Sequence, residues 1–104
     1  MHAIVFVTCP SGGDAERISK ALLERKLAAC VSAISGVRSL YLWRGSMESA
    51  SETLLLIKTR ANLVGELIEE VRRLHPYEVP EIVAVPISDG FKGYLDWIDE
   101  ETAR

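Results

Sequence analysis

The sequence has little of what marks a secreted, membrane-bound or nucleic-acid-binding protein. Cys9 and Cys30 are its two cysteines, and their spacing is not that of a CxxC pair. This excludes a disulfide scaffold and predicts a reducing, cytoplasmic location. Apolar runs such as 3–7 and 54–57 are far shorter than the roughly 20 residues of a membrane-spanning helix. No membrane partner is therefore expected, and the N-terminus shows no secretory leader pattern.

Basic residues are outnumbered by acidic ones. The 104 residues include 12 Lys and Arg against 15 Asp and Glu, a formal net charge of −3, and no basic block is longer than a pair such as Arg72–Arg73. This balance argues against a nucleic-acid partner, because such proteins present a basic face. A hydrophobic content of 48% is enough for a core, and the length predicts one domain over residues 1–104.

The apolar patterns predict an order of strand, helix, two strands, helix, strand and a final short helix. Strands are expected over 3–8, 29–43, 52–59 and 82–87, and helices over 11–26, 62–74 and 91–101. Ser11 with Asp14 three residues later is typical of a helix start, and Pro76 should end the second helix. Ser35–Gly36 predicts a bulge, and 44–46 predicts a turn.

This order is the α+β ferredoxin-like pattern βαββαβ with an added C-terminal helix. Right-handed crossovers should place both longer helices on one face of a four-stranded antiparallel sheet. The second and third strands should form an extended hairpin, longer than so small a sheet needs. Because Pro86 has no N–H to donate, the fourth strand should lie at an edge or carry a bulge.

The strands are apolar on both faces. Segments 4–7, 54–57 and 82–85 are apolar at every position, whereas a sheet with helices on one face should alternate with polar residues. Exposing the second face would leave a large apolar patch, so we expect the chain to associate with copies of itself. The alternative is that the C-terminal helix folds back over that face.

A set of short motifs runs through most of the chain in a fixed order. They are 27–31 (LAACV), 39–45 (SLYLWRG), Glu52, 57–59 (IKT), 75–82 (HPYEVPEI) and Tyr94, Leu95, Trp97 and Ile98. Together they resemble the CutA family of divalent-cation-tolerance proteins over residues 5–98. The resemblance implies a ferredoxin-like homotrimer, similar in architecture to the PII signalling proteins, that is linked to tolerance of copper and other divalent metals and is not an enzyme. Tyr41, Trp43 and Trp97 are then expected in hairpin and trimer packing.

His75 is the first candidate metal ligand. Imidazole binds copper and zinc well, and this residue lies beside Glu78 and Glu81 in a loop stiffened by prolines. The alternative is that His75 caps the preceding helix and hydrogen-bonds a carbonyl group.

The resemblance also implies a copper site built from a cysteine late in the first strand and two consecutive histidines. The matching positions are Val7, Leu74 and His75, so His75 alone retains a ligand side chain. Cys9 follows Val7 by two residues and would face the same side if the strand continues. Its thiolate would suit copper(I) or zinc. The alternative is an ordinary loop thiol.

Glu52, Lys58, Tyr77 and Glu81 are polar residues placed among apolar strands. Such groups either form hydrogen-bond networks or line a pocket, so we expect an interface network or a cleft between subunits. Two hypotheses follow. The protein is either a trimer that binds copper or another divalent metal, without needing it to fold, or a PII-like regulatory module that binds a small ligand or a protein partner.

An enzymatic alternative comes from residues 11–13. Ser11–Gly12–Gly13 before a helix can hold an anion with backbone N–H groups, as in acylphosphatases, which share this fold and length. Those enzymes need an arginine in this loop, and residues 9–14 contain none. Fold analogy alone is weak support, so no enzymatic activity is expected.

Overall fold

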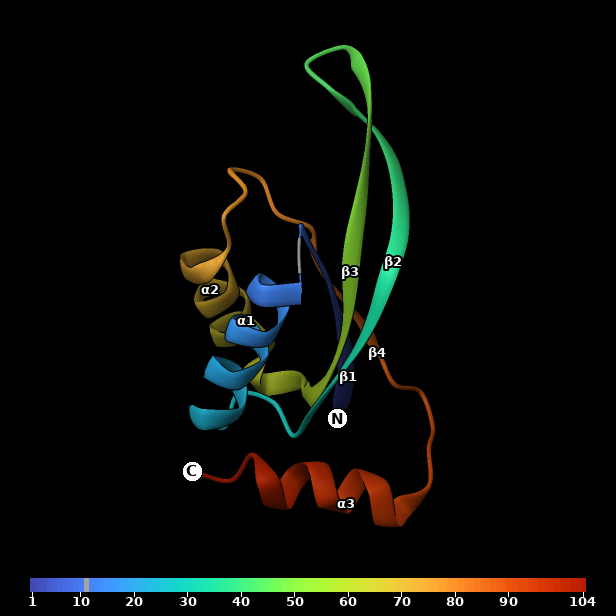
Figure 1. Cartoon of the computed structure of the whole chain (residues 1–104). Helices are drawn as coiled ribbons and strands as arrows, with labels where there is room; N and C mark the ends of the chain where they lie inside the picture. Colours follow the sequence, from blue (N-terminus) through green and yellow to red (C-terminus); the bar gives the residue numbers. More distant parts are fainter. Residues whose placement is uncertain (11) are drawn as a thin grey trace.

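The computed structural model describes residues 1–10 and 12–104 and has the expected order of elements (Figure 1). They are β1 (His2–Cys9), α1 (Gly12–Glu24), β2 (Cys30–Trp43), β3 (Ser46–Arg60), a 3-10 turn (Ala61–Leu63), α2 (Val64–Leu74), β4 (Ile82–Pro86) and α3 (Lys92–Glu101). The ferredoxin-like α+β fold is confirmed. The predicted helix-start residue, Ser11, lies outside the described residues.

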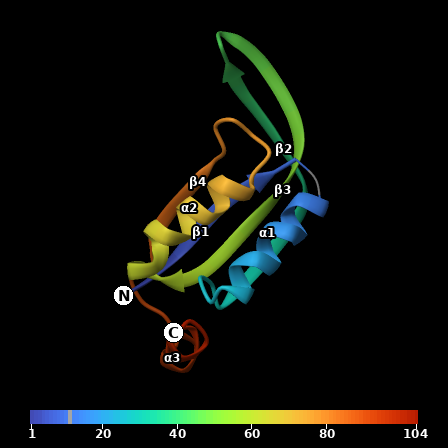
Figure 2. The same cartoon turned by 90° about the vertical axis from the view of Figure 1, so that its left-hand side faces the viewer.

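The strands form a sheet in the order β2-β3-β1-β4, with every neighbouring pair antiparallel. Helices α1 and α2 lie side by side on one face of it, as Figures 1 and 2 show. β4 is an edge strand, and Pro86 at its end pairs with Ala3. The edge position expected for a strand containing proline is confirmed.

The β2–β3 hairpin is longer than the sequence pattern predicted. β3 begins at Ser46, not at Glu52. Residues 46–52 carry no apolar alternation, but their backbone pairs with β2 up to a turn at Arg44 and Gly45, which have φ of 51° and 84°. Backbone pairing needs no apolar side chain, so the pattern missed this half of the strand. The bulge predicted at Ser35–Gly36 is confirmed by a register shift there.

The core lies between the sheet and helices α1 and α2. Its fully buried side chains alternate along β1 and β3 and recur at helical spacing on the helices. They include Val5, Val7, Leu55, Ile57, Ile18, Leu22, Leu67 and Val71. This cluster holds the strands in place relative to helices α1 and α2.

The opposite face of the sheet is left uncovered within the protomer. Ile34 and Val83 are 50% exposed there and Val85 is 44% exposed, next to partly buried Ile4 and Phe6. α3 runs across the end of the sheet and does not fold back over this face (Figure 1). Within the described residues, no helix is long and apolar enough to cross a membrane.

An ionic network joins α1 to α2 on the outer side of the helix layer. Glu70, 4% exposed, accepts hydrogen bonds from Arg25 at 2.7 Å and from Arg73 at 3.1 and 2.9 Å. The Arg73 hydrogen bonds, followed by the positive charge of Arg25, lower the pKa of Glu70 below its usual 4.5. Glu66 is similarly paired with Arg104 at 2.6 Å, and this hydrogen bond lowers the pKa of Glu66.

Acid should therefore destabilise the fold through Glu70. A carboxyl group whose pKa is lowered by folding contributes stability above its unfolded pKa, and that stability is lost as the pH falls through the lower folded value. We expect the melting temperature to fall below about pH 4.5, with a shallower fall in Glu70→Gln, which should also melt earlier at neutral pH. Thermal melts followed by circular dichroism across this range test it. Glu69→Gln, the same change at an exposed neighbour, should keep the wild-type slope, and an equal slope in Glu70→Gln would contradict the assignment.

Candidate functional site

A cleft lies between the β2–β3 hairpin and the loop 75–81, and its volume is about 820 Å³. Most of the residues that the sequence singled out for a ligand cleft or for hairpin packing line it together: Tyr41, Trp43, Glu52, Tyr77 and Glu81. They come from β2, β3 and the loop, which are far apart in the chain. The tertiary structure thus joins two predicted groups, ligand candidates and packing aromatics, into one site.

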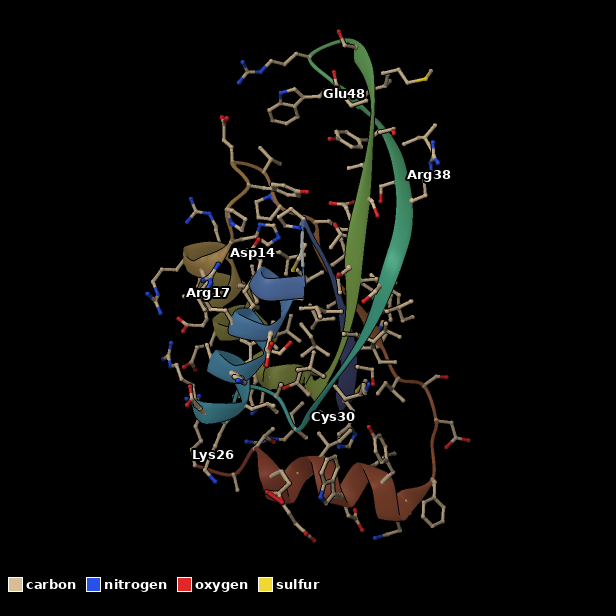
Figure 3. All side chains as sticks on the ribbon, in the orientation of Figure 1. Asp14, Arg17, Lys26, Cys30, Arg38 and Glu48 are labelled. Atoms are coloured by element: carbon tan, nitrogen blue, oxygen red, sulfur yellow. The ribbon has the colours of Figure 1, made fainter. Side chains whose placement is uncertain are left out.

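The hairpin supplies one wall by simple alternation. Tyr41 pairs directly with Glu48, and Trp43 and Glu52 lie at even spacings from them along the two strands. Successive side chains of a strand point to opposite faces, so these four residues share one face. Figure 3 shows Glu48 on the side of the hairpin that faces the loop and Arg38 on the opposite side.

Hydrogen bonds of His75 connect the loop to the end of β1. The His75 Nε2 lies 2.8 Å from the carbonyl oxygen of Thr8, and its Nδ1 accepts a hydrogen bond of 3.1 Å from the backbone N–H of Tyr77. A carbonyl can only accept and a backbone N–H can only donate, so the ring proton is on Nε2. The carbonyl hydrogen bond is the one that the structural alternative for His75 predicted.

Tyr77 connects His75 to Glu52 in the cleft. Its ring lies 4.9 Å from that of His75, and its hydroxyl donates a 2.8 Å hydrogen bond to Oε2 of Glu52. Burial, then the hydrogen bond to negatively charged Glu52, raises the pKa of Tyr77 to about 12. At neutral pH the hydroxyl therefore remains a hydrogen-bond donor. The chain Thr8–His75–Tyr77–Glu52 makes the inner end of the cleft rigid.

Arg44 of the hairpin turn contacts two residues that line the cleft, Trp43 on the hairpin and Glu78 on the loop. Its guanidinium carbon lies 5.2 Å from the ring centroid of Trp43, a cation–π arrangement, and Nη2 lies 3.6 Å from Glu78. Sequence reasoning assigned no role to Arg44 or Glu48. Glu48 lies opposite Tyr41 because of the hairpin register, and the Arg44 contacts depend on how the loop approaches the hairpin.

Three of the sequence candidates lie elsewhere. Lys58 is on β3 away from the cleft, where its ammonium group donates to Ser32 and to the carbonyl of Leu56. Trp97 is on α3, stacked on Tyr94 with ring centroids 5.7 Å apart. Cys9 continues β1 and, like Val7, is fully buried toward the helices. The expectation that Cys9 faces the same side as Val7 is confirmed.

The residues present do not fit the copper site that the resemblance implies. Both ring nitrogens of His75 are held in hydrogen bonds, and Val7 and Leu74 have no donor atom. Burial, then the negative charges of Asp14 and Glu52, raises the pKa of the Cys9 thiol to about 11, so the metal-binding thiolate is disfavoured. In the part of the chain that the structure describes, no three His, Cys, Asp or Glu side chains are grouped to hold a metal ion.

The comparison with known proteins gives the family. The model of the CutA1 divalent ion tolerance protein family matches residues 3–101. The divalent-cation tolerance protein CutA of Thermus thermophilus is 48% identical over 98% of this chain and 99% of its own, and that of Archaeoglobus fulgidus is 47% identical over 96% and 97%.

Solved structures agree with this assignment. The Thermus thermophilus protein superposes with a TM-score of 0.96 at 48% identity, covering 99% of this chain and 100% of that one. CutA from Xylella fastidiosa gives a TM-score of 0.96 at 43% identity over 98% of both chains. A relative from Archaeoglobus fulgidus is called periplasmic and one from Arabidopsis thaliana chloroplastic, so the cytoplasmic location stays a prediction. The chain belongs to the CutA1 family of divalent ion tolerance proteins.

Proposed function

We propose that this chain acts in divalent-cation tolerance as a homotrimeric binding protein, and that its functional site is the cleft between the hairpin and loop 75–81. The observation that carries the proposal is the Tyr77–Glu52 hydrogen bond at the floor of a cleft of about 820 Å³. A cleft with aromatic walls and a few fixed polar groups is the usual form of a small-ligand site. This is the PII-like alternative, with the ligand in place of a copper ion.

Self-association is supported by apolar surface in two places. The uncovered sheet face carries Val83 and Val85, and the projecting hairpin carries Leu40, Leu42 and Met47, which are 66%, 73% and 76% exposed. A monomer rarely leaves so much contiguous apolar surface in water. Three subunits, rather than two, is what membership of this family implies. In such an assembly a neighbouring subunit would border the projecting hairpin and its cleft.

A binding role, rather than catalysis, is supported by the state of His75 and Tyr77. A general base must have a free nitrogen or oxygen within reach of the substrate proton. Both His75 nitrogens are held in internal hydrogen bonds, and the Tyr77 hydroxyl is held by Glu52 with its pKa raised to about 12. The family's name describes a tolerance role and no reaction.

Native mass spectrometry of the metal-stripped protein, titrated with copper(II), tests this proposal. We expect a trimer that takes up no copper in a saturable manner, because both His75 ring nitrogens are held in hydrogen bonds and burial disfavours the Cys9 thiolate. Chelator should leave the melting temperature unchanged, since no metal is needed for folding. Saturable uptake of three copper ions per trimer, abolished in His75→Ala, would instead establish a metal site. A monomer would refute the assembly.

A further inference from the structure

We infer that the cleft recognises an organic cation, an ammonium or guanidinium group on a compact apolar body, and that Arg44 occupies the place of this cation in the free protein. The inference rests on the proposed function, because it takes the cleft as the ligand site. It goes further by giving the chemical class of the ligand and the residue that the ligand displaces.

The first support is the arrangement that already surrounds Arg44. A guanidinium group lies over the face of Trp43 at 5.2 Å and beside a carboxylate oxygen of Glu78 at 3.6 Å. Aromatic faces attract cations because the ring carries negative charge density above its plane. The guanidinium group of Arg44 therefore shows that Trp43 and Glu78 together can hold a positively charged group.

The second support is the charge of the cleft lining. Glu48, Glu52, Glu78 and Glu81 line it together with the rings of Tyr41, Trp43 and Tyr77. Arg38 is also at the rim, but its side chain extends from the far side of the hairpin (Figure 3). A cleft with carboxylates of one sign and low-dielectric walls concentrates cations and repels anions.

The third support is Glu52 at the floor. The residue is 6% exposed, and within residues 1–10 and 12–104 its carboxyl group accepts one hydrogen bond, from Tyr77. A carboxylate can accept about four hydrogen bonds, so Glu52 keeps acceptor capacity in the cleft. The Thr8–His75–Tyr77 chain fixes the position of Glu52. Because this acceptor is already ordered, little conformational entropy is lost when a ligand binds to it.

Arg44 can leave its place at low cost. The side chains of Arg44 and Glu78 are 73% and 74% exposed, and exposed ion pairs contribute little to stability. A ligand cation that also buries an apolar body against Tyr41 and Trp43 would gain contacts that Arg44 lacks. Arg44 is thus a competitor, and its removal should strengthen ligand binding.

Three isosteric probes separate charge from shape: benzamidine, a cation; benzamide, neutral; and benzoate, an anion. In Trp97→Phe the chain retains Trp43 as its one tryptophan, because the sequence has two. Fluorescence of Trp43 in the full-length protein then reports occupation of the cleft. We expect benzamidine to bind at least about fivefold more tightly than benzamide, and benzoate to bind more weakly still.

Two variants and one control test where the ligand cation binds. Arg44→Gln should tighten benzamidine binding by about threefold, because the internal competitor is gone. Arg72→Gln makes the same charge change on α2, at an exposed ion pair with Glu69, and should leave the affinity unchanged. Glu78→Gln removes the carboxylate that Arg44 contacts and should weaken benzamidine binding by about threefold, with benzamide little affected. Thermal melts verify that each variant is folded.

The possible results are separable. Equal binding of benzamidine and benzamide, or weaker benzamidine binding in Arg44→Gln, overturns the cation inference while leaving the cleft as the ligand site. Failure of all three probes to change Trp43 fluorescence also overturns it. The assembly and copper measurements above do not depend on these probes, so they judge the proposed function separately.

Discussion

Val83→Glu should convert the proposed trimer into folded protomers. Val83 is 50% exposed in the protomer, on edge strand β4 opposite Phe6, in the middle of the uncovered face. In a separate protomer the new carboxylate stays hydrated, so the fold should survive. At an apolar interface the same charge would lose its hydration, which costs about 3 kcal/mol or more for each subunit. Size-exclusion chromatography with light scattering measures the assembly, and circular dichroism measures the fold.

Leu23→Glu is the matched control for this change. Leu23 is 42% exposed on α1, on the helix side of the sheet, so it introduces the same charge at similar exposure away from the proposed interface. We expect it to remain trimeric. A trimer in Val83→Glu would show that subunits associate through another surface, and loss of the trimer in both variants would point to a general effect of charge.

His75→Ala should lower the free energy of unfolding by about 3 kcal/mol, because it removes two hydrogen bonds and leaves a cavity. The ring is 8% exposed and connects Thr8 at the end of β1 to Tyr77 in the loop. His75→Phe keeps most of the ring volume but neither nitrogen, so its smaller loss isolates the hydrogen-bond contribution. Chemical denaturation of all three proteins gives these differences.

His2→Ala is the control, since His2 is the other histidine of the chain. It makes a hydrogen bond of 2.9 Å to Asp99 on α3, at the opposite end of β1 from the cleft. We expect a smaller effect on stability and none on Trp43 fluorescence, whereas His75→Ala should change both. If His75→Ala were as stable as the wild type, the hydrogen bonds of His75 to Thr8 and Tyr77 would not stabilise the fold.

Much of the cleft could be predicted from the sequence because its residues contrast with their surroundings. Glu52 and Tyr77 were noticed as polar groups among apolar segments, and Tyr41 and Trp43 as large aromatics on a hairpin. Glu48 was missed because residues 46–52 are mostly serine and glutamate, and their apolar members, Met47 and Ala50, do not follow the period of a strand. Arg44 was missed because a turn residue gives no sign of the loop that approaches it.

The local sequence determined the elements and the apolar character of both sheet faces, since strand and helix periodicity are properties of neighbouring residues. Runs such as 4–7 and 54–57 were enough to predict an unpartnered face. The tertiary structure decided the roles of the candidate side chains. In the folded chain both ring nitrogens of His75 form hydrogen bonds, one with Thr8 and one with Tyr77. Lys58 lies outside the cleft, and Cys9 is buried. Whether a nitrogen or thiol can bind a metal depends on its hydrogen-bond partners and burial, and these come from segments that are distant along the chain.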